Sequence, residues 1–174
     1  FSLLLSLSAV FTSASTWALP TDREQPIRVQ ADSAELDDKQ GVAVYRGGVV
    51  ITQGSLKITG DTVTITQTPQ GDIDVFTAVG EPAYHEQKPA ADKQRVQAYG
   101  LAIQFYASNE RIVLIDQAKV IQEGNTFEGE KIVYDTKRQI VNAGRANGTS
   151  ITSPRPRIDM VIQPKSKPAE QQAQ

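Results

Sequence analysis

The sequence predicts an all-β protein built from many short antiparallel strands, and three observations support this fold class. Beyond residue 20 there are 14 Val and 14 Ile but four Leu, and Thr adds twelve more β-branched residues. β-Branched side chains fit the half-buried surface of a pleated sheet, whereas helical cores favour Leu and Ala. From residue 27 to 145, turn-forming residues recur every five to twelve positions, and the runs between them alternate apolar and polar side chains.

Length and composition exclude many kinds of function. A chain of 174 residues suits one domain, and a net charge of −2 provides no strongly basic surface for nucleic acid. The chain has no Cys, which excludes disulfides and Cys-based metal sites, and its single His, His85, argues against His-cluster metal sites and a Ser-His-Asp triad. The sequence therefore predicts a binding, transport or structural protein with no cofactor, no metal and no catalytic residue.

Carboxylate pairs are the remaining candidates for catalysis. They are Asp37 with Asp38, Asp72 with Asp74, and Glu128 with Glu130. Paired carboxylates hydrolyse glycosides when they are held at a suitable separation. All three pairs lie beside turn glycines, where acidic side chains solvate loops, so we interpret them as loop residues and expect no enzyme.

The two ends of the chain are predicted to lie outside the folded domain. Residues 1–11 are uncharged and largely apolar, and small residues follow at Thr16 and Ala18, as in the apolar region and cleavage site of a secretory signal peptide. We expect a signal peptide over residues 1–18, with its basic n-region missing from this sequence, and a single domain over residues 19–163. Residues 164–174 are predicted to be a disordered tail, because they have too few apolar groups to offset the entropy of ordering.

Within the domain, each run between turns predicts a strand with one apolar face. The runs include residues 41–45, 49–51, 55–59 and 61–66, and a last strand at 158–162. Residues 70–94 carry Gly80, Pro82 and Pro89 and are predicted to contain the longest loop, with His85 exposed in it.

The strand pattern occurs twice along the chain. The tripeptide Val-Gln-Ala at 29–31 returns at 96–98, and turns and inward positions coincide over about 40 residues at an offset of 67 to 70. In this alignment Val42 and Val44 fall opposite Ile112 and Leu114. Two similar halves, joined through residues 70–94, account for the repeat.

Alternation predicts an inner face of sixteen apolar side chains. They are Ile27, Val29, Leu36, Val42, Val44, Val49, Ile51, Ile58, Val63, Ile65, Phe105, Ile112, Leu114, Phe127, Ile132 and Tyr134. Two interpretations of this face remain open. It is either the closed core of a structural or carbohydrate-binding module of the cell envelope, or the interior of an open roll that accepts the acyl chains of a lipid.

An ordered set of motifs resembles the LptA/OstA-like family. The motifs are QPIRVQAD at 25–32, GGVVITQG at 47–54, GEPA at 80–83 and GEKI at 129–132, together with Leu36, Gly41 and Ile58. The likeness covers residues 25 to about 145. It implies an elongated antiparallel β-jelly roll of about sixteen strands, which shields the lipid A acyl chains of lipopolysaccharide in the periplasm.

The resemblance also implies partners and residue roles. Ile27, Val29, Leu36 and Phe105 fall on strands that contact lipid in this family. The implied partners are lipopolysaccharide (lipid A), LptC at the N-terminal edge, LptD at the C-terminal edge and further copies of the chain joined head to tail, with no nucleic acid. The edge strands expected to pair with partners by β-augmentation carry Val29, Asp32, Ile158, Met160 and Ile162.

Overall fold

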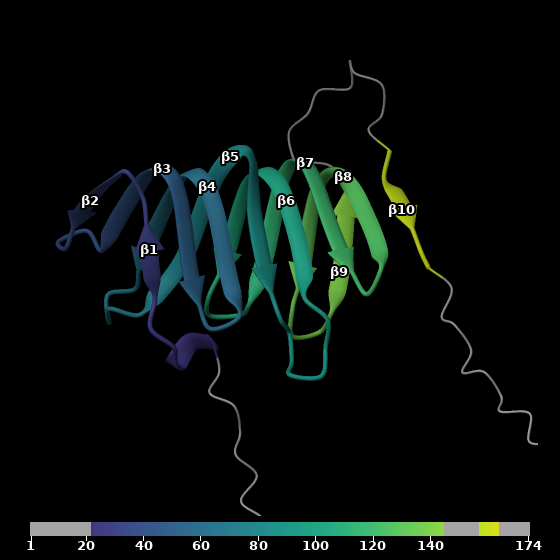
Figure 1. Ribbon diagram of the computed structural model, residues 1–174, viewed down its shortest axis with the longest axis horizontal. Coiled ribbons are helices and arrows are strands. Elements are labelled where there is room, and N and C mark those ends of the chain that lie inside the picture. The colour runs from purple at the N-terminus through teal and green to yellow at the C-terminus, as the bar shows by residue number, and fades with distance from the viewer. Residues whose placement is uncertain (1–21, 145–156, 164–174) are drawn as a thin grey trace, which may run out of the picture.

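The computed structural model describes residues 22–144 and 157–163, which form ten β-strands and one short 3₁₀ turn (Figure 1). The strands lie side by side along the longest axis, with β1 and β2 at one end and β9 and β10 at the other. The elements are η1 (Asp22–Glu24), β1 (Arg28–Gln30), β2 (Ser33–Asp37), β3 (Val42–Gln53), β4 (Leu56–Gln67), β5 (Ile73–Gln87), β6 (Val96–Tyr106), β7 (Arg111–Gln122), β8 (Asn125–Asp135), β9 (Ile140–Gly144) and β10 (Asp159–Val161). The predicted all-β class is confirmed.

All ten strands belong to one antiparallel sheet that splits into two layers. β3 pairs with β1 through residues 50–52 and with β2 through residues 42–46. At the other end, β8 pairs with β10 through residues 126–128 and with β9 through residues 131–135. We call the layer that contains β2 and β9 the first layer, and the layer that contains β1 and β10 the second layer.

A crease divides each of the long strands β3–β8 into two halves. The ladder loses its register near residues 47–48, 60–61, 80–82 and 116–117. Irregularities of this kind bend strands, so a row of them folds the sheet over on itself. Counted by halves, the ten strands give the sixteen segments that the family resemblance implies. The hairpin loops of both layers lie opposite the crease, along a side that we call the seam.

The core lies between the two layers. Residues at alternate positions of paired strands form continuous rows across each layer. One row of the first layer consists of Ile65, Phe76, Phe105, Ile112 and Tyr134. The facing row of the second layer consists of Ile51, Ile58, His85, Ala98 and Val120. All of these side chains are buried, which confirms the predicted alternation with period two.

One part of the predicted inner face is wrong. Ala43 and Tyr45 pack against the core, and Val42 and Val44 therefore lie on the outer face of the first layer. At the irregularity two residues of β3, 47 and 48, lie opposite the single residue Asp61 of β4, and odd-numbered positions of β3 face inward on both sides of it. The alternation in this run shows that Val42 and Val44 face one side of the strand and Ala43 and Tyr45 the other. It does not show which side the rest of the protein covers, and the two valines favoured the wrong one.

The prediction that residues 70–94 contain the longest loop is confirmed in part: the longest connection that the structure describes in full lies at residues 88–95, but most of the region is a strand. Residues 73–87 form β5, the longest strand, and its connection to β6 takes only residues 88–95. Pro82 lies at the crease, where the ladder is already interrupted, so it removes no regular ladder hydrogen bond. His85 is fully buried in β5 rather than exposed in a loop.

The internal repeat is confirmed by the strand register. Ala43 pairs with Ile65 as Ile112 pairs with Tyr134, and each residue of the first pair lies 69 positions before its counterpart. This uniform separation puts Ala43 rather than Val42 in the place of Ile112.

Some predictions concern residues near the ends of the chain. The expected signal peptide (1–18) and tail (164–174) lie outside the described residues, so these boundaries stay predictions. The last strand, predicted at 158–162, is confirmed as β10. Within the described part of the chain, no helix is long and apolar enough to cross a membrane.

Candidate functional site

The interior opens to the outside at the N-terminal end of the roll. A cavity of about 270 Å³ lies there between the layers. Ile27 and Val29 line it from the second layer, and Leu36, Ala43 and Tyr45 line it from the first. Leu36 is 64% exposed, because no further strand of the described chain covers this end. We call this cavity the N-terminal mouth.

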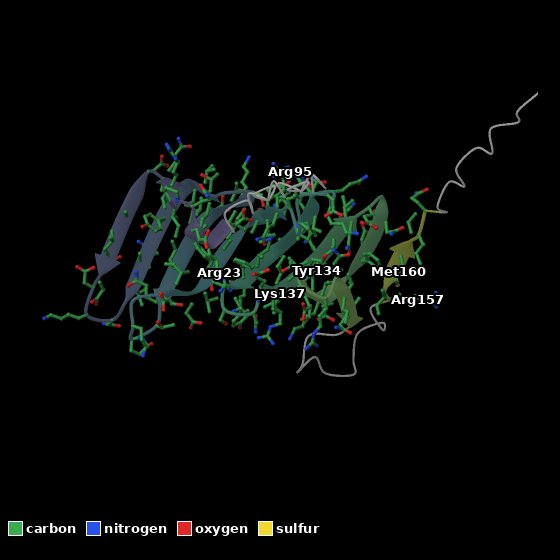
Figure 2. All side chains as sticks on the ribbon, turned by 90° about the horizontal axis from the view of Figure 1, so that it is seen from below. Arg23, Arg95, Tyr134, Lys137, Arg157 and Met160 are labelled. Atoms are coloured by element: carbon green, nitrogen blue, oxygen red, sulfur yellow. The ribbon has the colours of Figure 1, made fainter. Side chains whose placement is uncertain are left out.

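The C-terminal end also exposes apolar side chains. Met160 of β10 lies opposite Phe127 of β8 and is 49% exposed (Figure 2). Ile158 and Ile162, which flank β10, are 46% and 69% exposed. Each of the terminal strands β1, β2, β9 and β10 pairs with a single strand of the described chain, so each has a free edge. The predicted edge residues thus lie where a partner strand has room to pair.

Most of the predicted inner-face residues lie inside the roll. Ten are buried: Val49, Ile51, Ile58, Val63, Ile65, Phe105, Ile112, Leu114, Ile132 and Tyr134. Three are partly buried and pack against them: Ile27, Val29 and Phe127. Leu36 lies at the N-terminal mouth. Val42 belongs to the outer face by strand register but also lines this mouth, and Val44 lies outside. Contact with a lipid stays a prediction for all of these residues.

Sequence reasoning missed several inner residues. They include Ala43, Tyr45, Phe76, Ala78, Ile103 and Val120. Phe76 and Ala78 were missed because residues 73–79 carry apolar side chains on both faces, so alternation does not set the phase of this run. The bulky aromatic ring of Phe76 was the one available signal.

Buried polar side chains interrupt the apolar interior. The ring of His85 lies 5.1 Å from that of Phe105, and neither of its nitrogens has a hydrogen-bond partner among the described residues. Burial lowers the pKa of His85 to about 3, outweighing the opposing charge of Glu86, so the imidazole is neutral at pH 7. Burial likewise raises the pKa of Tyr134 to about 12, and its hydroxyl also has no partner in the described chain.

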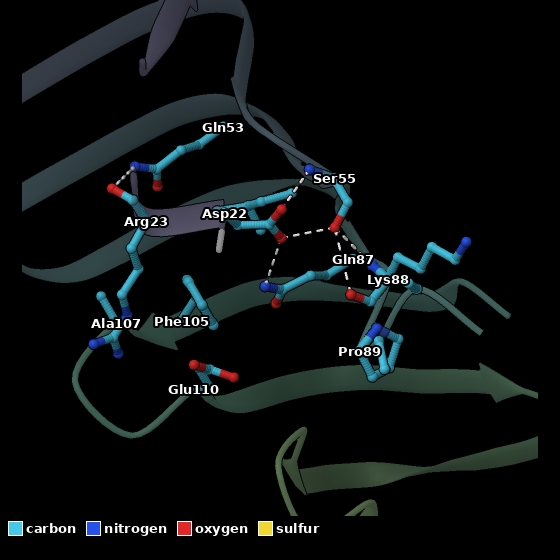
Figure 3. A pocket seen from close by; sticks show the side chains of 13 residues that line it. Asp22, Arg23, Gln53, Ser55, Gln87, Lys88, Pro89, Phe105, Ala107 and Glu110 are labelled. Carbon is cyan, nitrogen blue, oxygen red and sulfur yellow. Dashed lines mark hydrogen bonds between the residues drawn. The ribbon is translucent and has the colours of Figure 1, made fainter. Parts of the chain in front are cut away.

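A second cavity, of about 390 Å³, lies on the seam between the layers (Figure 3). Leu56 and Gln87 line it from the second layer, and Phe105, Ala107 and Glu110 line it from the first. The short turn η1 forms another wall. We call this cavity the seam cleft.

Asp22 fixes η1 to the second layer. Its carboxylate accepts hydrogen bonds from the backbone N–H of Ser55 (2.7 Å), the hydroxyl of Ser55 (2.7 Å) and Nε2 of Gln87 (3.0 Å). The side chain of Arg23 extends in the other direction, toward Ala107 of the first layer (Figure 3). The turn therefore spans the seam.

Gln53 and Gly54 strengthen this attachment. Gln53 Nε2 donates hydrogen bonds to the carbonyl oxygens of Arg23 (3.2 Å) and Gln25 (3.0 Å). Gly54 has a φ of +58°, and a Cβ at this position would collide with the carboxylate of Asp22. The β3–β4 hairpin thus needs glycine both for its backbone conformation and for the close approach of η1.

Together these features define a class of protein: an elongated β-jelly roll whose apolar interior lies between two layers, opens at its N-terminal end and leaves apolar side chains exposed at its C-terminal end. The described residues contain no group of His, Cys, Asp or Glu side chains that could hold a metal ion. The interior offers apolar surface and a few buried polar atoms without partners among the described residues, which suits the binding of long apolar groups.

Comparison with known proteins identifies the family. The family model described as LptA/(LptD N-terminal domain) LPS transport protein matches residues 28–140. The lipopolysaccharide export system protein LptH of Pseudomonas aeruginosa is 72% identical over 165 residues, which are 95% of this chain and 94% of the relative. The lipopolysaccharide export system protein LptA of Haemophilus influenzae is 32% identical, covering 87% of this chain and 91% of the relative. LptA of Escherichia coli strain K12 is 29% identical over 87% of this chain and 82% of the relative.

A solved structure agrees with this result. The crystal structure of P. aeruginosa LptH, described as the LptA homologous periplasmic component of the lipopolysaccharide transport device, is 75% identical and superposes with a TM-score of 0.76. The match covers 83% of this chain and 100% of that chain. This protein belongs to the LptA/LptD N-terminal domain family of lipopolysaccharide transport proteins.

Proposed function

We propose that this protein is a periplasmic, non-enzymatic carrier that holds the acyl chains of lipopolysaccharide between its two sheet layers and bridges the inner and outer membranes. The names of its relatives as lipopolysaccharide export proteins support this assignment. The observation that carries it is the N-terminal mouth, where Leu36 is exposed beside Ile27 and Val29 at the open end of the apolar interior.

The hydrophobic effect explains the need for such a carrier. Exposing one CH₂ group to water costs about 0.8 kcal/mol, so a twelve-carbon chain costs about 9 kcal/mol. A lipid with several acyl chains therefore crosses an aqueous compartment only when its chains are shielded. A channel of similar apolar sites shields them while letting the lipid move from one protein to the next.

Lipid entry requires the two layers to move apart. Side chains fill the centre of the interior, where Ile51, Ile58 and Leu114 are fully buried. The strands are continuous between the layers only at the crease, so the seam is the side on which the layers separate. We infer that the acyl chains enter at a mouth, displace packing contacts and hold the layers apart.

The free strand edges provide the docking sites for partners. We assign LptC to the N-terminal edge at β1 and β2, and LptD to the C-terminal edge at β9 and β10. Pairing of one end with the other end of a second copy is heterologous and does not close on itself, so it produces head-to-tail oligomers. Such an oligomer joins the interiors of successive copies.

Photo-crosslinking to lipopolysaccharide tests the proposed function. A photoreactive residue replaces Leu36 at the mouth, Phe105 in the interior or Val44 on the outer face of the same layer. We expect crosslinks from the first two positions and none from Val44, because only the inner face contacts the acyl chains.

Two results would contradict this proposal. Equal crosslinking at Val44 would mean that lipid binds the outside of the roll. No crosslinking at Leu36 and Phe105 would indicate a closed core, and the protein would then be a structural or carbohydrate-binding module.

A further inference from the structure

The seam cleft contains a buried polar atom that has no partner. Gln87 lines the cleft and is only 8% exposed. Its Nε2 donates a hydrogen bond to Asp22, so its carbonyl oxygen Oε1 points away from Asp22 (Figure 3). Oε1 is buried and has no hydrogen-bond partner among the described residues. A buried acceptor without a donor is unfavourable, so the site favours a ligand that supplies one.

The orientation of the Gln87 amide is fixed by its surroundings. The carboxylate of Asp22 is a pure acceptor and is held in place by two hydrogen bonds from Ser55. Reversing the amide would bring Oε1 against this carboxylate and lose the hydrogen bond from Nε2. The unpartnered atom is therefore an acceptor, and the missing group is a donor.

The rest of the cleft wall favours an apolar chain. Leu56 and Phe105 line it. His85 lies two residues before Gln87 on the same face of β5, and its ring contacts that of Phe105. A water molecule occupies about 30 Å³ of liquid, so a cavity of about 390 Å³ has room for about a dozen groups of methylene size. The cleft thus accommodates one chain along its apolar wall, and polar or charged residues make up seven of its thirteen lining residues.

Charged side chains lie at the rim of the cleft. Arg23 of η1 and Lys88 after β5 both line it, and so does the carboxylate of Glu110 from the first layer. The carboxylate of Asp22 is occupied by its hydrogen bonds to Ser55 and Gln87. The side chain of Lys88 extends away from the cleft, whereas that of Arg23 extends toward Ala107 (Figure 3), so Arg23 is the cation that suits the anionic end of an amphiphile whose chain extends inward.

We propose that the seam cleft binds one acyl chain that carries a hydroxyl group, and that Oε1 of Gln87 accepts a hydrogen bond from this hydroxyl. The inference rests on the proposed function, since it specifies which acyl chains the interior accepts. Gln87 is then a specificity-determining residue, and η1 is the wall that orients its amide.

The test compares two fatty acids that differ by a single oxygen. The affinities of the full chain for tetradecanoic acid and for 3-hydroxytetradecanoic acid are measured by isothermal titration calorimetry below their critical micelle concentrations. One hydrogen bond is worth about a factor of five in affinity, so we expect the hydroxylated acid to bind about fivefold more tightly. In Gln87→Leu, which has no acceptor, we expect equal affinities. Ser55→Ala is the matched control, because it removes a hydrogen bond to Asp22 but keeps Oε1, and it should retain the preference.

Several results would overturn the inference. Equal affinities in the unsubstituted protein would mean that water alone satisfies Oε1. A preference that persists in Gln87→Leu would place the hydroxyl elsewhere. Because the unsubstituted protein alone decides the first point, a folding defect in the variant leaves the test intact.

The fatty-acid titration and the crosslinking test of the proposed function can fail independently of each other. Crosslinking of lipopolysaccharide at Leu36 without a hydroxyl preference would overturn only the role of Gln87. A hydroxyl preference without crosslinking would leave the seam cleft as a fatty-acid site on a protein that does not carry lipopolysaccharide.

Discussion

At the scale of single residues, the interior carries polar groups that an ordinary closed core would exclude. His85, Gln87 and Tyr134 each have at least one buried polar atom without a partner in the described chain. Each such atom costs about 1–3 kcal/mol of folding stability relative to a satisfied one. In a carrier, a bound ligand with polar groups along its chains can supply the missing hydrogen bonds. In a purely structural core no ligand enters, and the cost of these atoms is not recovered.

The buried His85 makes the stability of the protein depend on pH. Its pKa is about 3 in the folded state and near 6.5 in the unfolded chain, so between about pH 3 and pH 6.5 the unfolded state binds the proton and the folded state does not. We expect the free energy of unfolding to fall as pH drops below 6.5, with a slope that approaches about 1.4 kcal/mol per pH unit. Urea unfolding between pH 7 and pH 5, above most carboxylate titrations, measures this slope.

The variant His85→Leu isolates this effect. It replaces an unpaired polar side chain with an apolar one of similar size, so we expect unchanged or higher stability at pH 7 and a flatter pH profile. An identical slope in His85→Leu would show that His85 does not cause the pH dependence.

At the scale of elements, the crease determines the architecture. Six long strands bend at nearly the same level, and the irregularities align from β3 to β8. The backbones approach closely there, since a Cβ on Gly60 would lie 2.8 Å from the carbonyl oxygen of Val79. The crease is thus a packed hinge between the layers, while in the described part of the chain loops and η1 close the seam opposite it.

Substitution of Gly60 tests the packing at the crease. In Gly60→Ala the new methyl group meets backbone atoms that cannot rotate away, so we expect a loss of about 1–3 kcal/mol in the free energy of unfolding. Gly144→Ala in β9 is the control, because a Cβ there meets nothing within 4 Å. Equal stabilities of the two variants, measured by urea unfolding, would mean that the crease tolerates a side chain and is not tightly packed.

At the scale of the whole molecule, both ends combine a free strand edge with exposed apolar side chains. Leu36 marks the N-terminal mouth, and Met160 and Ile162 mark the C-terminal end. Strand edges of this kind are templates for pairing. The same feature that allows association into a bridge therefore also makes the ends prone to pairing with one another.

A charge at the C-terminal end tests head-to-tail association. In Met160→Asp, a carboxylate would have to be buried in the contact between copies, so we expect weaker self-association, with a dissociation constant at least about tenfold higher. Sedimentation velocity over a range of protein concentrations measures it. Thr64→Asp, on the outer face in the middle of the roll, should associate like the unsubstituted protein. Equal association of both variants would place the contact elsewhere.

The sequence by itself determined the fold class, the repeat and most of the inner face. Val, Ile and Thr in alternating runs predict strands because their local geometry fits a pleated surface, and no long-range information is needed for this. The inward positions of Val49, Ile51, Ile58, Ile112 and Leu114 follow from the same alternation. The family resemblance added the jelly roll and its ligand, and the comparisons confirmed the family.

Tertiary structure alone decided the phase of β3, the status of residues 73–87 and the seam. Val42 and Val44 satisfy the alternation as well as Ala43 and Tyr45 do, and only the pairing of β3 with β4 shows which set is covered. Gly80 and Pro82 predicted a loop because glycine and proline interrupt regular ladders, yet at the crease the ladder is interrupted in every neighbouring strand. Nothing in the sequence singles out Gln87 or connects it with Asp22, which lies 65 residues away. Their contact, and the burial of His85, arise only when the folded sheet brings its two layers and η1 together.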